Sequence, residues 1–126
     1  MPWRSQARVH MRQEQGALVV TAYGEFDADE GDLLPAAWNE ADHQALPVTV
    51  LDLSGVTFGD SSFLDALLRA RLVHRAAGRR LVLVGPLQPA VITLLTVTQV
   101  LKHFEIADTL DQALGGEPLP DGTAPV

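Results

Sequence analysis

The sequence contains no cysteine among its 126 residues. Disulfide frameworks, thiolate metal sites, cysteine nucleophiles and Cys-x-x-Cys redox chemistry are therefore excluded. No apolar run reaches the ~18 residues of a membrane-spanning helix. The charged N-terminal residues are not followed by the apolar stretch of a signal peptide. We therefore expect a cytoplasmic protein that does not enter a membrane.

Positive charge is also scarce, with 9 Lys and Arg against 16 Asp and Glu and a formal net charge of −7. This balance argues against direct binding to nucleic acid or an anionic membrane. Residues 25–42 hold seven acidic residues and no Lys or Arg, whereas five arginines fall within residues 69–80. The arginines fit a solvated helix C-terminus, and a patch that docks a partner is the alternative.

Motifs for nucleotide or zinc chemistry are missing, because there is no Gly-x-Gly-x-x-Gly, no phosphate-binding Gly-x-x-x-x-Gly-Lys loop and no His-Glu-x-x-His. We predict no metal site and no cofactor. The four histidines lack a second ligand at helical spacing and are expected at the surface or the core edge. They are His10, His43, His74 and His103.

Hydrophobic residues make up 47% of the chain and charged residues 20%, which is ordinary for one globular domain. Short β-branched runs predict a hairpin around Gln15-Gly16, and two nearly continuous apolar runs predict central strands of a parallel sheet. Leucines at helical spacing predict a helix that stops near Gly78. The expected strands are 8–12, 18–24, 48–53, 81–84 and 104–106, and the expected helices are 32–45, 64–75, 89–97 and 109–114.

Together these elements predict a single α/β domain with a mixed sheet of four to five strands and helices packed on one side. The domain is expected to span residues 8–114, after an N-terminal extension of residues 1–7. Residues 115–126 are rich in Gly and Pro and are expected to form a flexible tail.

The most informative segment is Asp60-Ser61-Ser62, where a buried strand runs through a turn into an amphipathic helix. Side chains here can cap the free N–H groups of the helix, which accounts for one of the three residues. A hydroxyl at this place is also a suitable phosphate acceptor, because the helix dipole and free amides favour added negative charge.

The chain resembles the STAS-domain family, specifically bacterial anti-sigma factor antagonists, over roughly residues 8–114. The matching segments are 24–27, 51–58, 60–62 and 89–91. The resemblance implies a protein without catalytic activity that binds an anti-sigma factor serine kinase and releases a sigma factor. Phosphorylation would switch it off, and a phosphatase would be needed to reverse this.

By the same resemblance the phosphate acceptor is Ser61, with Ser62 as the competing assignment. Asp27, Asp60 and Ser62 match positions at the binding surface, and both aspartates are expected on the same rim of the sheet as Ser61. Phe63 stands where the family often has Gly. Its ring would either contact the partner or pack toward Leu67 in the core. Gln99 also replaces a common Gly.

Two other functions have partial support in the sequence. Phe58-Gly59-Asp60-Ser61 is similar to the first block of Gly-Asp-Ser hydrolases, but no Asp-x-x-His pair follows it. The stronger alternative is a STAS scaffold module of a stressosome-type or lipid-transport complex. Whether Ser61 becomes phosphorylated distinguishes this module from an anti-sigma factor antagonist.

Overall fold

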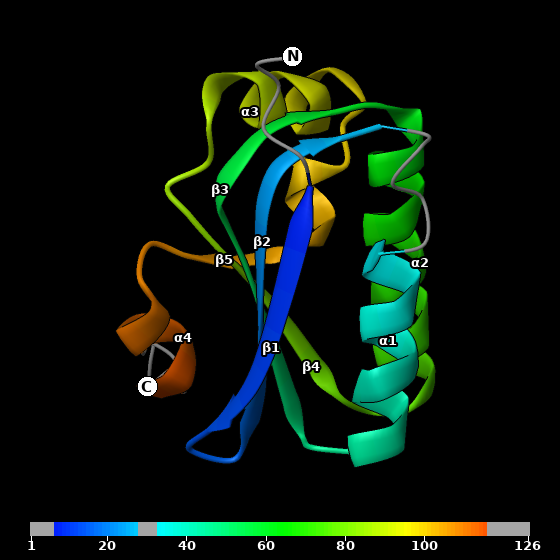
Figure 1. Cartoon of the computed structure of the whole chain (residues 1–126), viewed down its shortest axis with the longest axis vertical. Helices are drawn as coiled ribbons and strands as arrows, with labels where there is room; N and C mark the ends of the chain where they lie inside the picture. The colour runs from blue at the N-terminus through cyan, green and yellow to red at the C-terminus, as the bar shows by residue number, and fades with distance from the viewer. Residues whose placement is uncertain (1–6, 28–32, 116–126) are drawn as a thin grey trace.

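The computed structural model describes residues 7–27 and 33–115. They form one mixed sheet of five strands in the order β1-β2-β3-β4-β5. Strand β1 pairs antiparallel with β2, and the remaining pairs are parallel. The prediction of an α/β domain with a mixed sheet is therefore confirmed (Figure 1). The strands are β1 (Arg8–Glu14), β2 (Ala17–Phe26), β3 (Val48–Gly59), β4 (Arg80–Val84) and β5 (Glu105–Ala107).

The predicted hairpin joins β1 to β2 through a turn of two residues. Gln15 and Gly16 both have positive φ angles, 52° and 79°. Two such residues are what a type I′ turn requires, and its twist matches that of the paired strands. The turn fixes the register in which Glu14 lies opposite Ala17.

Three helices cover one face of the sheet, namely α1 (Leu33–Gln44), α2 (Ser61–Ala76) and α3 (Pro89–Val97). Each lies in the connection between two neighbouring parallel strands. Because right-handed crossovers that add strands in one direction leave the sheet on the same side, these helices share a face. Leucines from the sheet and the helices fill the space between them and are fully buried, including Leu51, Leu53, Leu67, Leu83 and Leu95.

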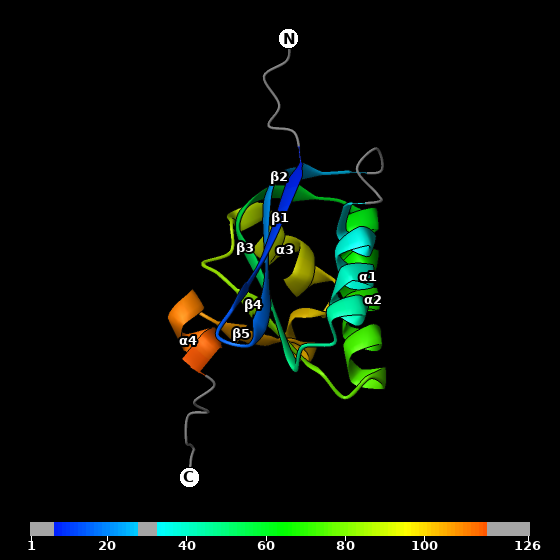
Figure 2. The same ribbon diagram turned by 60° about the horizontal axis from the view of Figure 1, so that its bottom comes forward.

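The short helix α4 (Leu110–Gly115) lies on the opposite face (Figure 2). Its Ala113 belongs to a second apolar cluster with Val19, Val50 and Val82. We had expected every helix on one side. Helix α4 differs because it follows the last strand, so no crossover determines its side.

Strand β3 runs to Gly59, beyond the predicted end at residue 53. Its second half pairs with β2 across two register shifts, at Thr21/Tyr23 and at Gly24/Glu25. The polar and glycine residues at this irregular pairing hide the strand pattern in the sequence. A 3-10 turn, η2 (Leu101–His103), was likewise not predicted. None of the helices in the two described ranges has the length and apolar character needed to cross a membrane.

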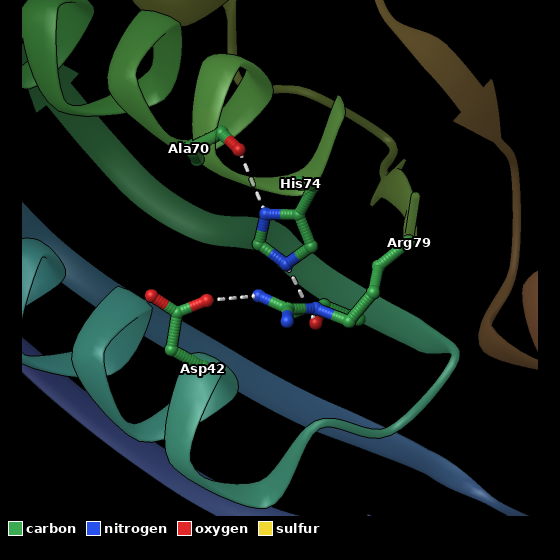
Figure 3. Close-up of polar contacts among 5 residues, drawn as sticks. Asp42, Ala70, His74 and Arg79 are labelled. Atoms are coloured by element: carbon green, nitrogen blue, oxygen red, sulfur yellow. Dashed lines mark hydrogen bonds and ion pairs between the residues drawn. The ribbon is translucent and has the colours of Figure 1, made fainter. Parts of the chain in front are cut away.

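His74 is buried in the core, which corrects the expected position at the surface or core edge. Its Nδ1 lies 2.7 Å from the carbonyl oxygen of Ala70, and its Nε2 lies 2.8 Å from the Thr49 hydroxyl (Figure 3). A carbonyl only accepts, so Nδ1–H donates to Ala70, and Nε2 accepts from Thr49. Burial lowers the pKa of His74 from its ordinary value of 6.5, and the charge of Arg79 acts in the same direction.

We expect the free energy of unfolding to decrease as the pH falls below 6.5, the ordinary value for histidine. The unfolded chain then binds a proton that folded His74 does not accept, and this favours unfolding. Urea unfolding at about pH 7.5 and about pH 5.5 measures the loss. His74→Gln should lose less stability between these conditions, and exposed His43→Gln should match the wild type. Equal losses in all three proteins would contradict the assignment.

Candidate functional site

The carboxyl ends of β2 and β3 meet at one edge of the sheet. Phe26 pairs with Gly59, and the amide of Asp60 donates to the Phe26 carbonyl over 3.2 Å. Asp27 and Asp60 directly follow these strand ends, and Ser61 begins α2 at the same edge (Figure 1). The structure therefore brings Asp27, Asp60 and Ser61 to one rim, as the sequence analysis expected.

Asp60 is the N-cap of α2. Its Oδ1 accepts hydrogen bonds from the amides of Ser62, at 2.8 Å, and Phe63, at 3.3 Å. These bonds satisfy two of the N–H groups that have no partner within the helix. Two of the amides that the sequence suggests as free for a phosphate are therefore already occupied. A phosphate on Ser61 would instead lie beside a carboxylate that already holds two amides.

Ser61 and Ser62 differ in exposure. The Ser61 side chain is exposed, whereas Ser62 is half-buried with its amide bound to Asp60. Both line a surface cavity of about 480 Å³ next to the first turns of α1 and α2. The other residues of its wall are Pro35, Asp65, Ala66 and Arg69.

Asp65 was not singled out in the sequence, and Arg69 was noted only as one of the five arginines within residues 69–80. The guanidinium of Arg69 donates from Nε to Asp65 Oδ2 over 2.7 Å, and both side chains are exposed. Ser61, Asp65 and Arg69 follow one another at four-residue spacing, which places them on the same helix face. That spacing could have indicated from the sequence that Asp65 and Arg69 lie beside Ser61. Nothing in the sequence indicates that Pro35 lies there too, because it belongs to another helix, α1.

Phe63 lies in the core, with 2% of its surface exposed. Its ring packs against Phe26 with the centroids 5.6 Å apart. A Cβ at Gly59 would lie only 2.6 Å from the Phe63 Cγ, so the ring fills the space that the glycine leaves. This corrects the expected partner contact of Phe63, and the core alternative describes its position.

A large apolar side chain is exposed near the same rim. Phe58, two residues before Asp60, keeps 45% of its surface exposed and pairs with Glu25 of β2. Within residues 7–27 and 33–115 there is no group of three or more histidine and acidic side chains placed to hold a metal ion. Exposed aromatic rings beside polar groups are common on surfaces that contact other proteins.

Replacing Asp60 with Ala should lower the free energy of unfolding by about 1 kcal/mol, because two amides of α2 lose their acceptor. Asp60→Asn should lose much less, since an amide oxygen can also cap a helix. Urea unfolding of the two variants and the wild type measures this difference. Equal losses from Ala and Asn would show that charge, and not capping, is the contribution of Asp60.

Gly59→Ala should lower the free energy of unfolding by roughly 1–3 kcal/mol, because the added methyl overlaps the Phe63 ring. Phe63→Leu in the same chain should recover part of the loss by removing the ring. A double-mutant cycle of these two positions measures the coupling. If the changes in unfolding free energy of the two substitutions simply add, the packing of the Phe63 ring does not depend on the absence of a side chain at Gly59.

Comparison with known proteins identifies the family to which this domain is similar. A family model described as "Mlab, STAS domain" matches residues 9–111. An anti-sigma factor antagonist from Mycobacterium paratuberculosis has a similar structure, with a TM-score of 0.73 and 28% identity over 87% of this chain and 92% of that chain. No protein of curated function matches.

Two further structures share the fold at lower identity. The phosphorylated form of the Bacillus cell fate determinant SpoIIAA has a TM-score of 0.66 and 18% identity, over 86% of this chain and 97% of that chain. An anti-sigma factor antagonist (STAS) domain protein from Planctomyces limnophilus has a TM-score of 0.70 and 21% identity, over 87% of this chain and 97% of that chain. The family match spans most of the chain and agrees with the motifs, so this chain belongs to the STAS domain family.

Proposed function

We propose that the protein is an anti-sigma factor antagonist that binds an anti-sigma factor serine kinase in the cytoplasm and so releases a sigma factor. Phosphorylation of Ser61 switches it off, and the protein has no catalytic activity of its own. The observation that carries the proposal is the exposed Ser61 hydroxyl at the start of α2, directly after the capping Asp60. The name of the similar Mycobacterium paratuberculosis protein supports the same role.

Ser61 is a better acceptor than Ser62 because a kinase has to reach the hydroxyl. Ser61 is exposed, and within the described residues its side chain makes no hydrogen bond that phosphorylation would break. Ser62 is half-buried, and its amide is bound to Asp60. Asp27, Asp60 and Ser62 then belong to the surface around the acceptor, where the partner binds.

The added phosphate acts on binding through its charge. It brings about −1.5 to −2 charges to a rim that already carries the carboxylates of Asp60 and Asp65. The one arginine of this cavity, Arg69, is paired with Asp65. A partner surface that fits a neutral hydroxyl has to desolvate this charge, and every ~1.4 kcal/mol of penalty weakens affinity tenfold.

The fold does not depend on the Ser61 hydroxyl. The Asp60 cap and the buried Phe63 ring hold the start of α2 in place. Repulsion between a phosphate and nearby carboxylates is small at a solvated surface, on the order of 1 kcal/mol. The proposal is therefore a change of surface chemistry on an intact domain.

A STAS scaffold module of a stressosome-type or lipid-transport complex is the second candidate. The matching family model is not itself described as an anti-sigma factor antagonist, which favours keeping this candidate. In that role the rim around Ser61 would bind a partner permanently, and kinase and ATP would leave the chain unmodified.

Incubation with ATP and a purified anti-sigma factor serine kinase of the same genome tests the proposal. The wild type should gain one phosphate by intact mass, and peptide mapping should place it on Ser61. Ser61→Ala should bind the kinase but gain no phosphate, because only a methyl remains, while Ser62→Ala should gain one like the wild type. Phosphate on Ser61→Ala would move the acceptor to Ser62, and no phosphate on the wild type would favour the scaffold module.

A further inference from the structure

A basic pocket lies at the end of α2 that is opposite to Ser61. Its volume is about 280 Å³, and Leu81 and Phe104 contribute apolar surface to it. Its polar residues are Arg71, His74, Arg75, Arg79, Arg80, His103 and Glu105. In a chain with a net charge of −7, this group of arginines in one concavity departs from the overall charge.

The end of α2 brings these arginines together. Gly78 has a φ of +70°, its amide donates to Arg75 O over 3.1 Å, and the Arg79 amide donates to His74 O over 2.8 Å. This pair of bonds is a Schellman motif, which ends the helix and reverses the chain. Arg80 at the start of β4 therefore faces the same pocket as the last turns of α2.

Two of the four arginines are neutralised within the domain. Arg80 donates from Nε to Glu105 Oε1 over 2.8 Å and makes a second bond to the same carboxylate. Arg79 donates to Asp42 over 2.6 Å, and only 10% of its side chain is exposed (Figure 3). These ion pairs hold β4 against β5 and the end of α2 against α1.

The other two arginines have no carboxylate partner among the described residues. Arg71 donates from Nε to the carbonyl of His103 over 3.0 Å, which orients its guanidinium without neutralising it. The Arg75 side chain makes no hydrogen bond or ion pair in the described part of the chain. The two stand one turn apart on α2, where like charges repel. The helix dipole favours cations at this end but does not require them to line a cavity.

We propose that this pocket docks an acidic segment of a partner protein, whose carboxylates bind Arg71 and Arg75. A guanidinium presents a planar fork that matches a carboxylate. The pocket is open to solvent at the surface, so acidic side chains of a peptide can reach both arginines. The net charge of −7 repels the dense charge of nucleic acid, so a sparsely charged acidic peptide is the fitting ligand.

This site is separate from the rim around Ser61. Helix α2 has 16 residues, which at 1.5 Å per residue separates its two ends by about 24 Å. Partners can therefore occupy both ends at the same time. The inference does not rest on phosphorylation, and Ser61→Ala should leave it unchanged.

Fluorescence anisotropy with a labelled ten-residue peptide that carries three glutamates among glycine and serine residues tests the site at low salt. The wild type should bind the peptide, and the variant carrying both Arg71→Gln and Arg75→Gln should bind at least tenfold more weakly. The matched control carries Arg8→Gln and Arg12→Gln on β1, which removes the same charge from another exposed surface. It should bind like the wild type, and thermal unfolding should show all three proteins folded.

Three results would overturn the proposal. They are no binding of the peptide to the wild type, an equal loss in the β1 control, and tighter binding of a ten-residue oligothymidylate than of the peptide. An equal loss would mean attraction by net charge alone, and preference for the oligonucleotide would make the pocket a nucleic-acid site.

Discussion

The joint between β3 and α2 is the feature on which the site depends. Gly59 leaves space that the Phe63 ring fills, and Phe63 packs against Phe26 at the end of the neighbouring strand. Asp60 lies between them and caps the helix with one carboxylate oxygen. Asp60 and Phe63, which lie before and after Ser61, are fixed in this way. Ser61 therefore lies on the rigid first turn of the helix with its hydroxyl in solvent.

Helix α2 is also held along its length by hydrogen bonds to buried side chains. The Trp38 indole donates to the Ala66 carbonyl over 2.9 Å, and His74 bonds to Ala70 and Thr49. Polar groups buried in this way have to be paired, so they fix the position of α2 against α1 and β3. The cavity at Ser61 and the basic pocket are therefore carried on one rigid element.

The sequence predicted those elements whose patterns depend on local spacing. The Gln15-Gly16 turn, the leucine pattern of α2 and the Asp60 cap were visible because each uses neighbouring residues. The second half of β3 was missed, since its pairing with β2 is irregular at Thr21 and Tyr23. Burial of His74 was missed for a similar reason, because its partner Thr49 lies on a strand 25 residues away.

In the candidate site, too, contacts between residues distant in the sequence could not be predicted. The resemblance to the STAS family placed Asp27, Asp60 and Ser61 on one rim. It could not place Pro35 beside Ser61, because that contact depends on how α1 packs against α2. The sequence also suggested free amides at the helix start. In the folded chain the Asp60 carboxylate accepts hydrogen bonds from two of them.

The central claim is that modification of Ser61 changes binding and leaves the domain folded. The most direct test compares the affinity of the unmodified and the Ser61-phosphorylated protein for the anti-sigma factor kinase, together with the Tm of both forms. The account predicts at least a tenfold loss of affinity, which is about 1.4 kcal/mol, with the two Tm values within about 4 °C. Equal affinities would contradict it, and so would a loss of binding accompanied by a large decrease in Tm.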